Sequence, residues 1–304
     1  MNGDFMGMSL FLGVDGGGTK CRARLSDPRG RTLGEGLGGP ANIWRDAVQA
    51  MGSVREACRA AIRAAGLPDS ALAEAHAGLG LAGAGQQSAV ERFSALPHPF
   101  ASITVETDAY AAWLGAFGGS DGGIVIVGTG SCGYAVVRGV ATYVGGFGAE
   151  ISDEGSGAAI GREAIRRALW AQDGRAPMSE LAAALLAQFP GGREPIIEWA
   201  KAAGPLDLAR FAPLVFEHAR AGDPLGRALV TEAAAEITRI AERLLAVGAP
   251  ALALLGGLAE PLRPWLPPAL AARLVAPRAD AMEGAILLAR RAQAARETQA
   301  RKRA

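Results

Sequence analysis

The chain has 304 residues, of which 50% are apolar and 20% are charged, the balance of a globular protein with a sizeable core. Its formal net charge of +1 creates no overall field toward nucleic acid or an anionic membrane surface, so we expect neither as a partner. A chain of this length is typical of two domains of ordinary size.

The cysteines form no CxxC pair and no cluster with histidine, so we expect neither a metal site built on them nor a disulfide framework. A reducing cytoplasm suits three separate thiols. Residues 1–10 lack a basic region followed by a sustained apolar stretch, and no apolar run is long enough to span a membrane. We therefore expect no signal peptide. The three cysteines are Cys21, Cys58 and Cys132. Met6 and Met8 are alternative start positions for translation.

The first part of the chain alternates strand and helix patterns. Expected strands are residues 10–14, 21–26, 32–36, 78–82 and 102–106. Expected helices are residues 44–65, 86–96 and 107–117. The flexible stretch GGSDGG at 118–123 is the best candidate for a domain boundary.

The pattern then restarts, with strands at 124–127 and 133–137 around a Gly/Thr turn. This strand, turn, strand order repeats that of residues 10–26, which makes a weak internal repeat. Later helices are expected at 154–170, 181–189, 208–220, 225–247 and 283–295, and strands at 251–255 and 274–276. Strands mixed with helices in this way indicate an α/β fold in two lobes.

The sharpest motif is GVDGGGTK at 13–20. A strand that ends in an acid is followed by three glycines, whose N–H groups can surround phosphate oxygens. Asp15 can hold a hydrated Mg²⁺. The spacing is not that of a P-loop, and a strand rather than a helix follows, unlike a dinucleotide-binding turn. A glycine-rich hairpin without a ligand is the alternative. The expected phosphate contacts are Gly16, Gly17, Gly18, Thr19 and Lys20.

Two further glycine motifs resemble parts of a nucleotide site. GTGSCG at 128–133 follows a very apolar strand; alone it is equally a β-turn, but two such turns on one site would hold a nucleotide's phosphates from both sides. In LALLGGLAE at 252–260 the Gly-Gly pair allows a flat adenine to lie against backbone, and a plain strand-to-helix connection is the alternative. The expected ATP contacts are Thr129, Gly130, Gly256 and Gly257.

The order of these motifs resembles that of the actin-like ATPase and sugar-kinase superfamily. The motifs are DGGGTK, GLGLAGAG at 78–85, GTGS, LLGGLAE and DAMEGAILLA at 280–289. Within that superfamily, GVDGGGTK, TDA at 107–109 and GGFGAEISDEGSG at 145–157 are similar to the N-acetylglucosamine kinase branch of the BadF/BadG/BcrA/BcrD ATPase family. The match extends from Gly13 to about Ala289.

This resemblance implies two actin-like (ribonuclease H-like) ATPase domains with an interdomain cleft. Residues 1–118, completed by a C-terminal helix at 280–304, would form one domain, and residues 119–279 the other. It also implies a homodimer that uses ATP and Mg²⁺, and the separate thiols favour the cytoplasm as its location.

Asp108 matches the family's catalytic aspartate. It would accept the proton of the sugar's 6-hydroxyl as that oxygen attacks the γ-phosphate of ATP, while Mg²⁺ and backbone donors neutralise charge. An aspartate before a helix is otherwise most often an N-cap. The expected reaction is phosphorylation of N-acetylglucosamine, with glucosamine as the alternative acceptor.

The resemblance implies a set of sugar contacts built from amide, carboxylate and aromatic groups. Phe147 stands where vertebrate enzymes carry tryptophan, a departure that keeps an aromatic stacking surface at this position. Glu154 and Ser156 are equally explained as helix-start residues. The implied sugar contacts are Asn42, Asp108, Ser131, Gly146, Phe147 and Asp153.

Three alternatives remain. Dehydratase activators of the same superfamily carry an iron–sulfur cluster held by cysteines, for which Cys21 and Cys58 have no fitting context. Bacterial repressor and kinase relatives carry a cysteine-rich zinc motif that is missing here. A regulator with an inactive site is the third alternative, and the presence of both Asp15 and Asp108 argues against it.

Overall fold

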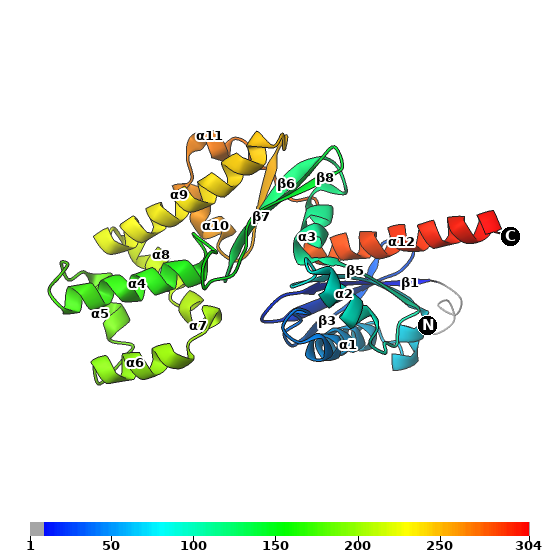
Figure 1. Cartoon of the computed structure of the whole chain (residues 1–304), viewed down its shortest axis with the longest axis horizontal. Coiled ribbons are helices and arrows are strands. Elements are labelled where there is room, and N and C mark those ends of the chain that lie inside the picture. The colour runs from blue at the N-terminus through cyan, green and yellow to red at the C-terminus, as the bar shows by residue number, and fades with distance from the viewer. Residues whose placement is uncertain (1–8, 304) are drawn as a thin grey trace. The chain divides into compact units, whose positions relative to one another are not determined.

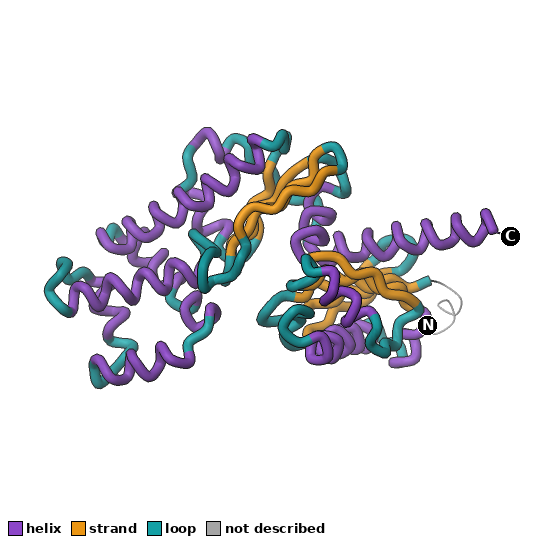
Figure 2. The backbone as a smooth tube through the Cα atoms, viewed as in Figure 1, coloured by secondary structure: helices purple, strands orange, loops and turns teal. Residues whose placement is uncertain are grey.

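The computed structural model describes residues 9–303; the alternative starts Met6 and Met8 lie outside them. The described chain divides into two compact units. The first unit comprises residues 9–120 with 277–303, and the second unit comprises Asp121–Ala276. Each unit is a sheet covered by helices (Figure 1, Figure 2), so the chain has the expected α/β fold.

The sheet of the first unit has five strands in the order β3-β2-β1-β4-β5. β1, β2 and β3 form an antiparallel meander, whereas β4 and β5 run parallel to β1. The carboxyl ends of β1, β4 and β5 therefore meet at one edge. The strands are β1 Leu10–Gly16, β2 Cys21–Ser26, β3 Thr32–Gly38, β4 Ala75–Leu81 and β5 Ser102–Thr107.

Helices cover the sheet of the first unit. α1 packs on β2 and β3, while α12 packs on β1, β4 and α3. α12 extends eight residues beyond the helix that the sequence pattern predicts at 283–295, as a solvated helix rich in arginine. The helices are α1 Ala47–Ala64, the 3₁₀ turn η1 Asp69–Glu74, α2 Gln87–Ser94, α3 Asp108–Phe117 and α12 Ala281–Arg303.

Glycines on the strands let these helices approach the sheet closely. A Cβ at Gly36 of β3 would lie 2.2 Å from the carbonyl oxygen of Ala57 in α1, and one at Gly78 of β4 would lie 1.9 Å from that of Ala285 in α12. Interiors packed this tightly have no room for an added methyl group. Many of the 42 glycines thus serve helix–sheet packing, a role that glycine clusters in the sequence did not indicate.

The sheet of the second unit has the order β8-β7-β6-β9, with β9 parallel to β6 and the other pairs antiparallel. This order and these directions are those of β3-β2-β1-β4 in the first unit. The weak internal repeat seen in the sequence is therefore a repeat of topology. The strands are β6 Gly122–Val127, β7 Ser131–Val137, β8 Val140–Gly145 and β9 Leu252–Leu255.

Most of the second unit is helical, and its helices share one apolar core with the sheet. They are α4 Gly157–Gln172, α5 Glu180–Leu186, α6 Arg193–Ala202, α7 Pro205–Ala209, α8 Ala212–Ala221, α9 Pro224–Ala246, α10 Ala259–Leu262, η2 Arg263–Trp265 and α11 Pro268–Ala271. Across residues 9–303, no helix combines the length and the apolar character needed to cross a bilayer.

The expected strand at 274–276 is wrong. Leu274 forms a single bridge with Leu252, and Pro277 follows at once without an N–H to extend the ladder. Conversely, β8 was not expected, although Arg138 and Gly139 both have positive φ, as a two-residue hairpin turn requires. α6 was also missed.

Two helical glycines give a matched test of this packing. A Cβ at Gly284 of α12 would lie 1.9 Å from the carbonyl oxygen of Ala111, whereas one at Gly52 of α1 would meet nothing within 4 Å. We expect Gly284→Ala to lower the free energy of unfolding by about 1–3 kcal/mol through overpacking. Gly52→Ala should raise it by about 0.5–1 kcal/mol, because alanine is the better helix former. Urea unfolding followed by circular dichroism measures both, and a destabilising Gly52→Ala would contradict the assignment.

Candidate active site

The carboxyl ends of three parallel strands form one edge of the first unit, which we call the carboxyl edge. In the register of the sheet, Gly80 of β4 lies between Asp15 of β1 and Glu106 of β5. A Cβ at Gly80 would lie 2.4 Å from that of Ala111 in α3, so the missing side chain lets the first turns of α3 pack onto the sheet. Asp108, the first residue of α3, therefore lies at the same edge as Asp15.

Asp108 is not the N-cap of α3. Thr107 occupies that position, and its hydroxyl oxygen accepts a hydrogen bond from the N–H of Tyr110 at 3.0 Å. The carboxylate of Asp108 instead accepts hydrogen bonds from backbone N–H groups, that of Ala109 at 2.9 Å and its own. The helix-cap explanation for this residue is wrong, and the remaining oxygen lone pairs can accept a proton or a ligand hydroxyl.

The surroundings of Asp108 disfavour its charged form. Burial raises the pKa of Asp108 to about 6, the N–H of Ala109 opposes that shift, and the nearby carboxylate of Asp15 adds to it. Desolvation and a neighbouring like charge are the two standard ways to raise a carboxyl pKa. A carboxyl with this pKa is a general base suited to work near neutral pH.

Asp15 forms an ion pair that the sequence did not reveal. It lies directly opposite Arg22 of β2, whose Nη2 donates to Oδ2 of Asp15 at 2.6 Å. No cluster of three metal-ligating side chains occurs among residues 9–303. A lone carboxylate fits Mg²⁺, which is usually held by one or two carboxylates together with substrate phosphates and water. Asp15 could hold that ion if Arg22 shares or yields the carboxylate.

The first glycine turn, Gly16–Lys20, is anchored at its base and open at its tip. The N–H of Gly17 donates to the carbonyl of Lys20 at 2.9 Å, and the carbonyls of Gly16 and Gly17 accept from Ala82 and Ala41. Within residues 9–303, the N–H groups of Gly18 and Thr19 donate to no backbone or side-chain acceptor. Two exposed, unpaired N–H groups beside a cationic Lys20 suit a phosphate.

Asn42 lies beside the end of β4, where it forms a bridge with Ala82. Its Oδ1 accepts hydrogen bonds from the N–H groups of Trp44 and Arg45, each at 3.1 Å. Because its oxygen is occupied, the Asn42 side chain can offer a ligand chiefly its NH₂ donors. Gly83, with φ of +82°, makes room for that oxygen.

In the second unit, α4 fixes the second glycine turn, Gly128–Ser131. The carbonyls of Gly128 and Thr129 accept hydrogen bonds from Gly157 and Ala158 in the first turn of α4, at 2.8 and 3.1 Å. Among the described residues, the N–H groups of Thr129 and Gly130 have no backbone partner. The helix thus orients the turn, and the turn itself carries the free donors.

Asp153 lies over this turn. A Cβ at Gly130 would lie 2.5 Å from Oδ2 of Asp153, and the N–H of Gly148 donates to its Oδ1 at 3.3 Å. Burial raises the pKa of Asp153, the N–H of Gly148 lowers it, and Glu154 and Glu150 raise it further. Asp153 also has φ of +61°, a backbone strain that is frequent at functional sites.

The remaining predicted sugar contacts surround the same turn. Gly146, with φ of +75°, packs on Cys132, and Phe147 is 78% exposed, so its ring is available to a ligand. The Ser131 hydroxyl, in contrast, is buried and donates to the carbonyl of Glu154 at 2.7 Å. Ser131 therefore connects the turn to the loop before α4, and Ser156 is the N-cap of that helix.

Gly256 and Gly257 follow β9, the parallel neighbour of β6. A Cβ at Gly256 would lie 2.2 Å from the carbonyl oxygen of Val127, so this glycine is required by contact with the strand that leads into the second glycine turn. Gly257 is exposed with open space around it. Beside the helix that follows is a cavity of about 420 Å³, lined by Arg220, Arg227, Glu260, Pro261, Pro264 and Trp265.

The structure therefore gathers the predicted residues into two groups. Asp15, the first glycine turn, Asn42 and Asp108 lie along the carboxyl edge of the first unit. The second glycine turn, Gly146, Phe147 and Asp153 lie together in the second unit, and the turn at Gly256–Gly257 follows the adjacent strand. Arg22, Gly80 and Gly83 were missed, since only the strand register and the loop geometry reveal their roles.

The raised pKa of Asp108 predicts a pH-dependent gain in stability when its charge is removed. The folded pKa of about 6 exceeds the ordinary value of 3.8, so the ionised carboxyl destabilises the fold above pH 6 and has no such effect below about pH 4. We expect Asp108→Asn to raise the free energy of unfolding at pH 7.5 by up to about 3 kcal/mol, and hardly at all at pH 4. Urea titrations at both pH values measure this. An equal effect at the two pH values would contradict the pKa assignment.

Comparisons with known proteins agree over most of the chain. The model of the BadF/BadG/BcrA/BcrD ATPase family matches residues 12–289. Glucosamine kinase GspK of Vibrio cholerae serotype O1 is 42% identical over 282 residues, 93% of this chain and 96% of that protein. A crystal structure of a candidate N-acetylglucosamine kinase from Chromobacterium violaceum has a TM-score of 0.88 at 37% identity, covering 93% of this chain and 99% of that one.

A ROK family glucokinase from Streptomyces griseus shares the fold, with a TM-score of 0.51 at 21% identity over 92% of this chain and 98% of that one. The predicted actin-like, two-domain α/β fold and the predicted family are both confirmed. On the extent of the family match, from β1 to the buried part of α12, the chain belongs to the BadF/BadG/BcrA/BcrD ATPase family.

Proposed function

We propose that this protein is an ATP-dependent sugar kinase that phosphorylates the 6-hydroxyl of an amino sugar. The observation that carries the proposal is Asp108, a carboxyl at the carboxyl edge that is not used as a helix cap and whose pKa is raised to about 6. A group of this kind is what a kinase needs to accept the proton of an attacking hydroxyl. The named kinases among its relatives support the same reaction.

In the proposed reaction, ionised Asp108 accepts the proton of the sugar hydroxyl as its oxygen attacks the γ-phosphate. The free N–H groups of Gly18 and Thr19, with Lys20, would bind phosphate oxygens of ATP, and those of Thr129 and Gly130 are a second set of donors for phosphate oxygens. Asp15 is the residue that would hold Mg²⁺, which neutralises phosphate charge in phosphoryl transfer.

We propose an amino sugar as the acceptor, held by Asn42 through its NH₂ group and by Gly146, Phe147 and Asp153. A carboxylate suits a hydroxyl or a protonated amine, whereas the exposed Phe147 ring suits an apolar part of a sugar. Relatives are named for glucosamine and for N-acetylglucosamine, so these two acceptors should be compared first.

The cysteines support a kinase over an iron–sulfur ATPase. Cys21 and Cys58 are both buried, and burial, with a smaller effect from Asp15, raises the pKa of Cys21 to about 12. Cluster ligands are thiolates, which such an environment strongly disfavours.

We further propose that the enzyme acts in the cytoplasm as a homodimer, and equilibrium sedimentation tests the assembly.

A coupled assay of ADP release tests the proposed reaction. We expect turnover with glucosamine or N-acetylglucosamine, and Asp108→Asn should lower kcat by at least about 10²-fold, since it removes the base. Sugar affinity, measured by calorimetry, should remain nearly unchanged. Asp173→Asn is the matched control, because its carboxylate is exposed and pairs with Arg175 on the surface. Sugar-independent turnover, or an active Asp108→Asn, would show that the proposal is wrong.

The cavity beside α10 suggests where the adenine ring binds. Its volume of about 420 Å³ is of ligand size, and it opens beside the helix that follows Gly256–Gly257. The guanidinium of Arg227 lies 5.6 Å from the centre of the Trp265 ring, so a flat cation and an aromatic ring border the same space. Such walls favour a planar, electron-rich base.

We therefore expect Arg227→Gln to raise the KM for ATP by about 5- to 10-fold, a loss typical of one stacking contact, with the KM for the sugar unchanged. Arg227 lies near the start of α9. Arg243→Gln, at the exposed far end of α9, is the control. Steady-state kinetics with each substrate varied in turn measures the effect. A change confined to the sugar KM would assign the cavity to another ligand.

A further inference from the structure

The outer face of α1 carries three arginines at helical spacing. Arg55, Arg59 and Arg63 are each four residues apart, so their side chains are neighbours on one stripe of the helix. Like charges at this spacing destabilise a helix unless an opposite charge compensates them. The stripe therefore needs compensation along its length.

Compensation within the protein reaches only one end of the stripe. Arg63 makes a bidentate ion pair with Asp69, at 3.0 and 2.9 Å, and Arg59 approaches Asp69 only to 3.7 Å. Arg55 enters no ion pair in the part of the chain that the structure describes. The Nε atoms of Arg55 and Arg59 are also buried without any hydrogen-bond acceptor. Buried donors are normally paired, so water or a ligand from outside the chain would supply the missing acceptors.

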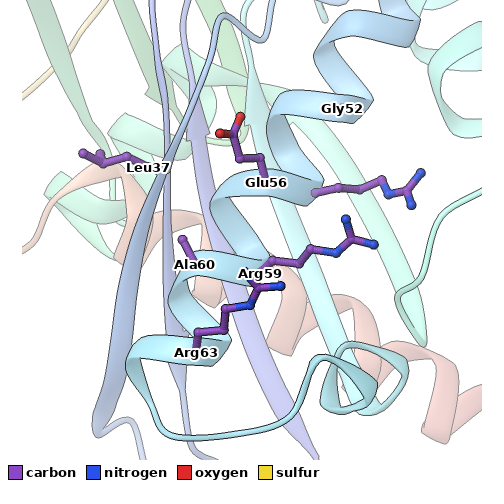
Figure 3. Close-up of a pocket in the computed structure, with 7 residues that line it drawn as sticks. Leu37, Gly52, Glu56, Arg59, Ala60 and Arg63 are labelled. Atoms are coloured by element: carbon purple, nitrogen blue, oxygen red, sulfur yellow. The ribbon is translucent and has the colours of Figure 1, made fainter.

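A cavity of about 460 Å³ lies at this stripe. Besides the arginines it is lined by Glu56, Ala60, Gly52 and Leu37. Leu37 is 67% exposed, and a Cβ added at Gly52 would meet no atom within 4 Å. In Figure 3, Glu56 lies on the side of α1 toward Leu37, whereas Arg59 extends from the other side of the helix. The cavity therefore has a cationic side formed by the arginines, and an opposite side where the Glu56 carboxylate lies toward the apolar Leu37.

We infer that this face of α1 binds a small phosphate-bearing organic molecule through Arg55 and Arg59. Two adjacent guanidinium groups offer forked donors that match the oxygens of a phosphate dianion, and charge-assisted bonds of this type are the strong ones. The open space above Gly52 and the side chain of Leu37 would accommodate the organic part. The lining includes no residue of the carboxyl edge, so the site is separate from the proposed catalytic residues of the first unit.

Calorimetric titration of the full chain with phenyl phosphate, at fixed ionic strength in chloride, tests the inference. We expect Arg55→Gln/Arg59→Gln to weaken binding at this site at least about tenfold, since both forks are lost. Gly52→Leu keeps every charge but fills the space, and it should weaken phenyl phosphate more than inorganic phosphate. Arg166→Gln, an exposed arginine paired with Glu163 on α4, should bind as the wild type does.

Thermal melts first establish that each variant is folded. Saturating AMPPNP should leave the binding to wild type intact, which separates this site from the glycine turns and from the proposed kinase reaction. Absence of phenyl phosphate binding by the wild type would overturn the inference. So would equal binding by the double variant, or complete competition by AMPPNP, because each would assign the phosphate to another part of the protein.

Discussion

The carboxyl edge of the first unit brings the carboxylates of Asp15 and Asp108 together, and the two groups have different electrostatic surroundings. The Asp15 carboxylate pairs with the charged guanidinium of Arg22 at 2.6 Å, whereas the Asp108 carboxylate accepts from neutral backbone N–H groups, among them that of Ala109. Electrostatic repulsion from Asp15 therefore adds to the desolvation of Asp108, and its pKa rises to about 6. Separate environments for two neighbouring acids are a common way to assign one to ligand binding and the other to proton transfer.

This edge exists because backbones pack closely behind it. Gly80 leaves room for α3, which carries Asp108. Gly13 and Gly78 leave room for α12, since a Cβ at these two positions would lie 2.1 and 1.9 Å from carbonyl oxygens of that helix. Each of these glycines replaces a side chain that would hold a helix away from the sheet. A helix from the end of the chain thereby completes a unit built from its beginning. The position of Asp108 therefore depends on contacts in which the strand contributes a glycine and no side chain.

The sequence was a good guide wherever one local pattern determines structure. The two glycine turns, the strands around them and the helix beginning near Asp108 follow from apolar runs bounded by turn residues, and the order of motifs identified the family. The role of Arg22 could not be predicted, since an arginine in an alternating strand is ordinarily solvated and only the register sets it opposite Asp15. The contact of Asp153 with Gly130 likewise depends on how a loop folds back over a turn.

The two units share one topology but present their phosphate-binding candidates by different means. In the first unit, the carbonyls of the glycine turn are tied to neighbouring loops at Ala41 and Ala82, and its tip is open. In the second unit, the carbonyls of Gly128 and Thr129 accept hydrogen bonds from the first N–H groups of α4. A helix N-terminus often binds phosphate directly, but here its donors are already used. An anion at this turn would therefore bind the N–H groups of Thr129 and Gly130. The turn separates that anion from the N-terminus of α4, so the dipole of the helix acts on it from a greater distance.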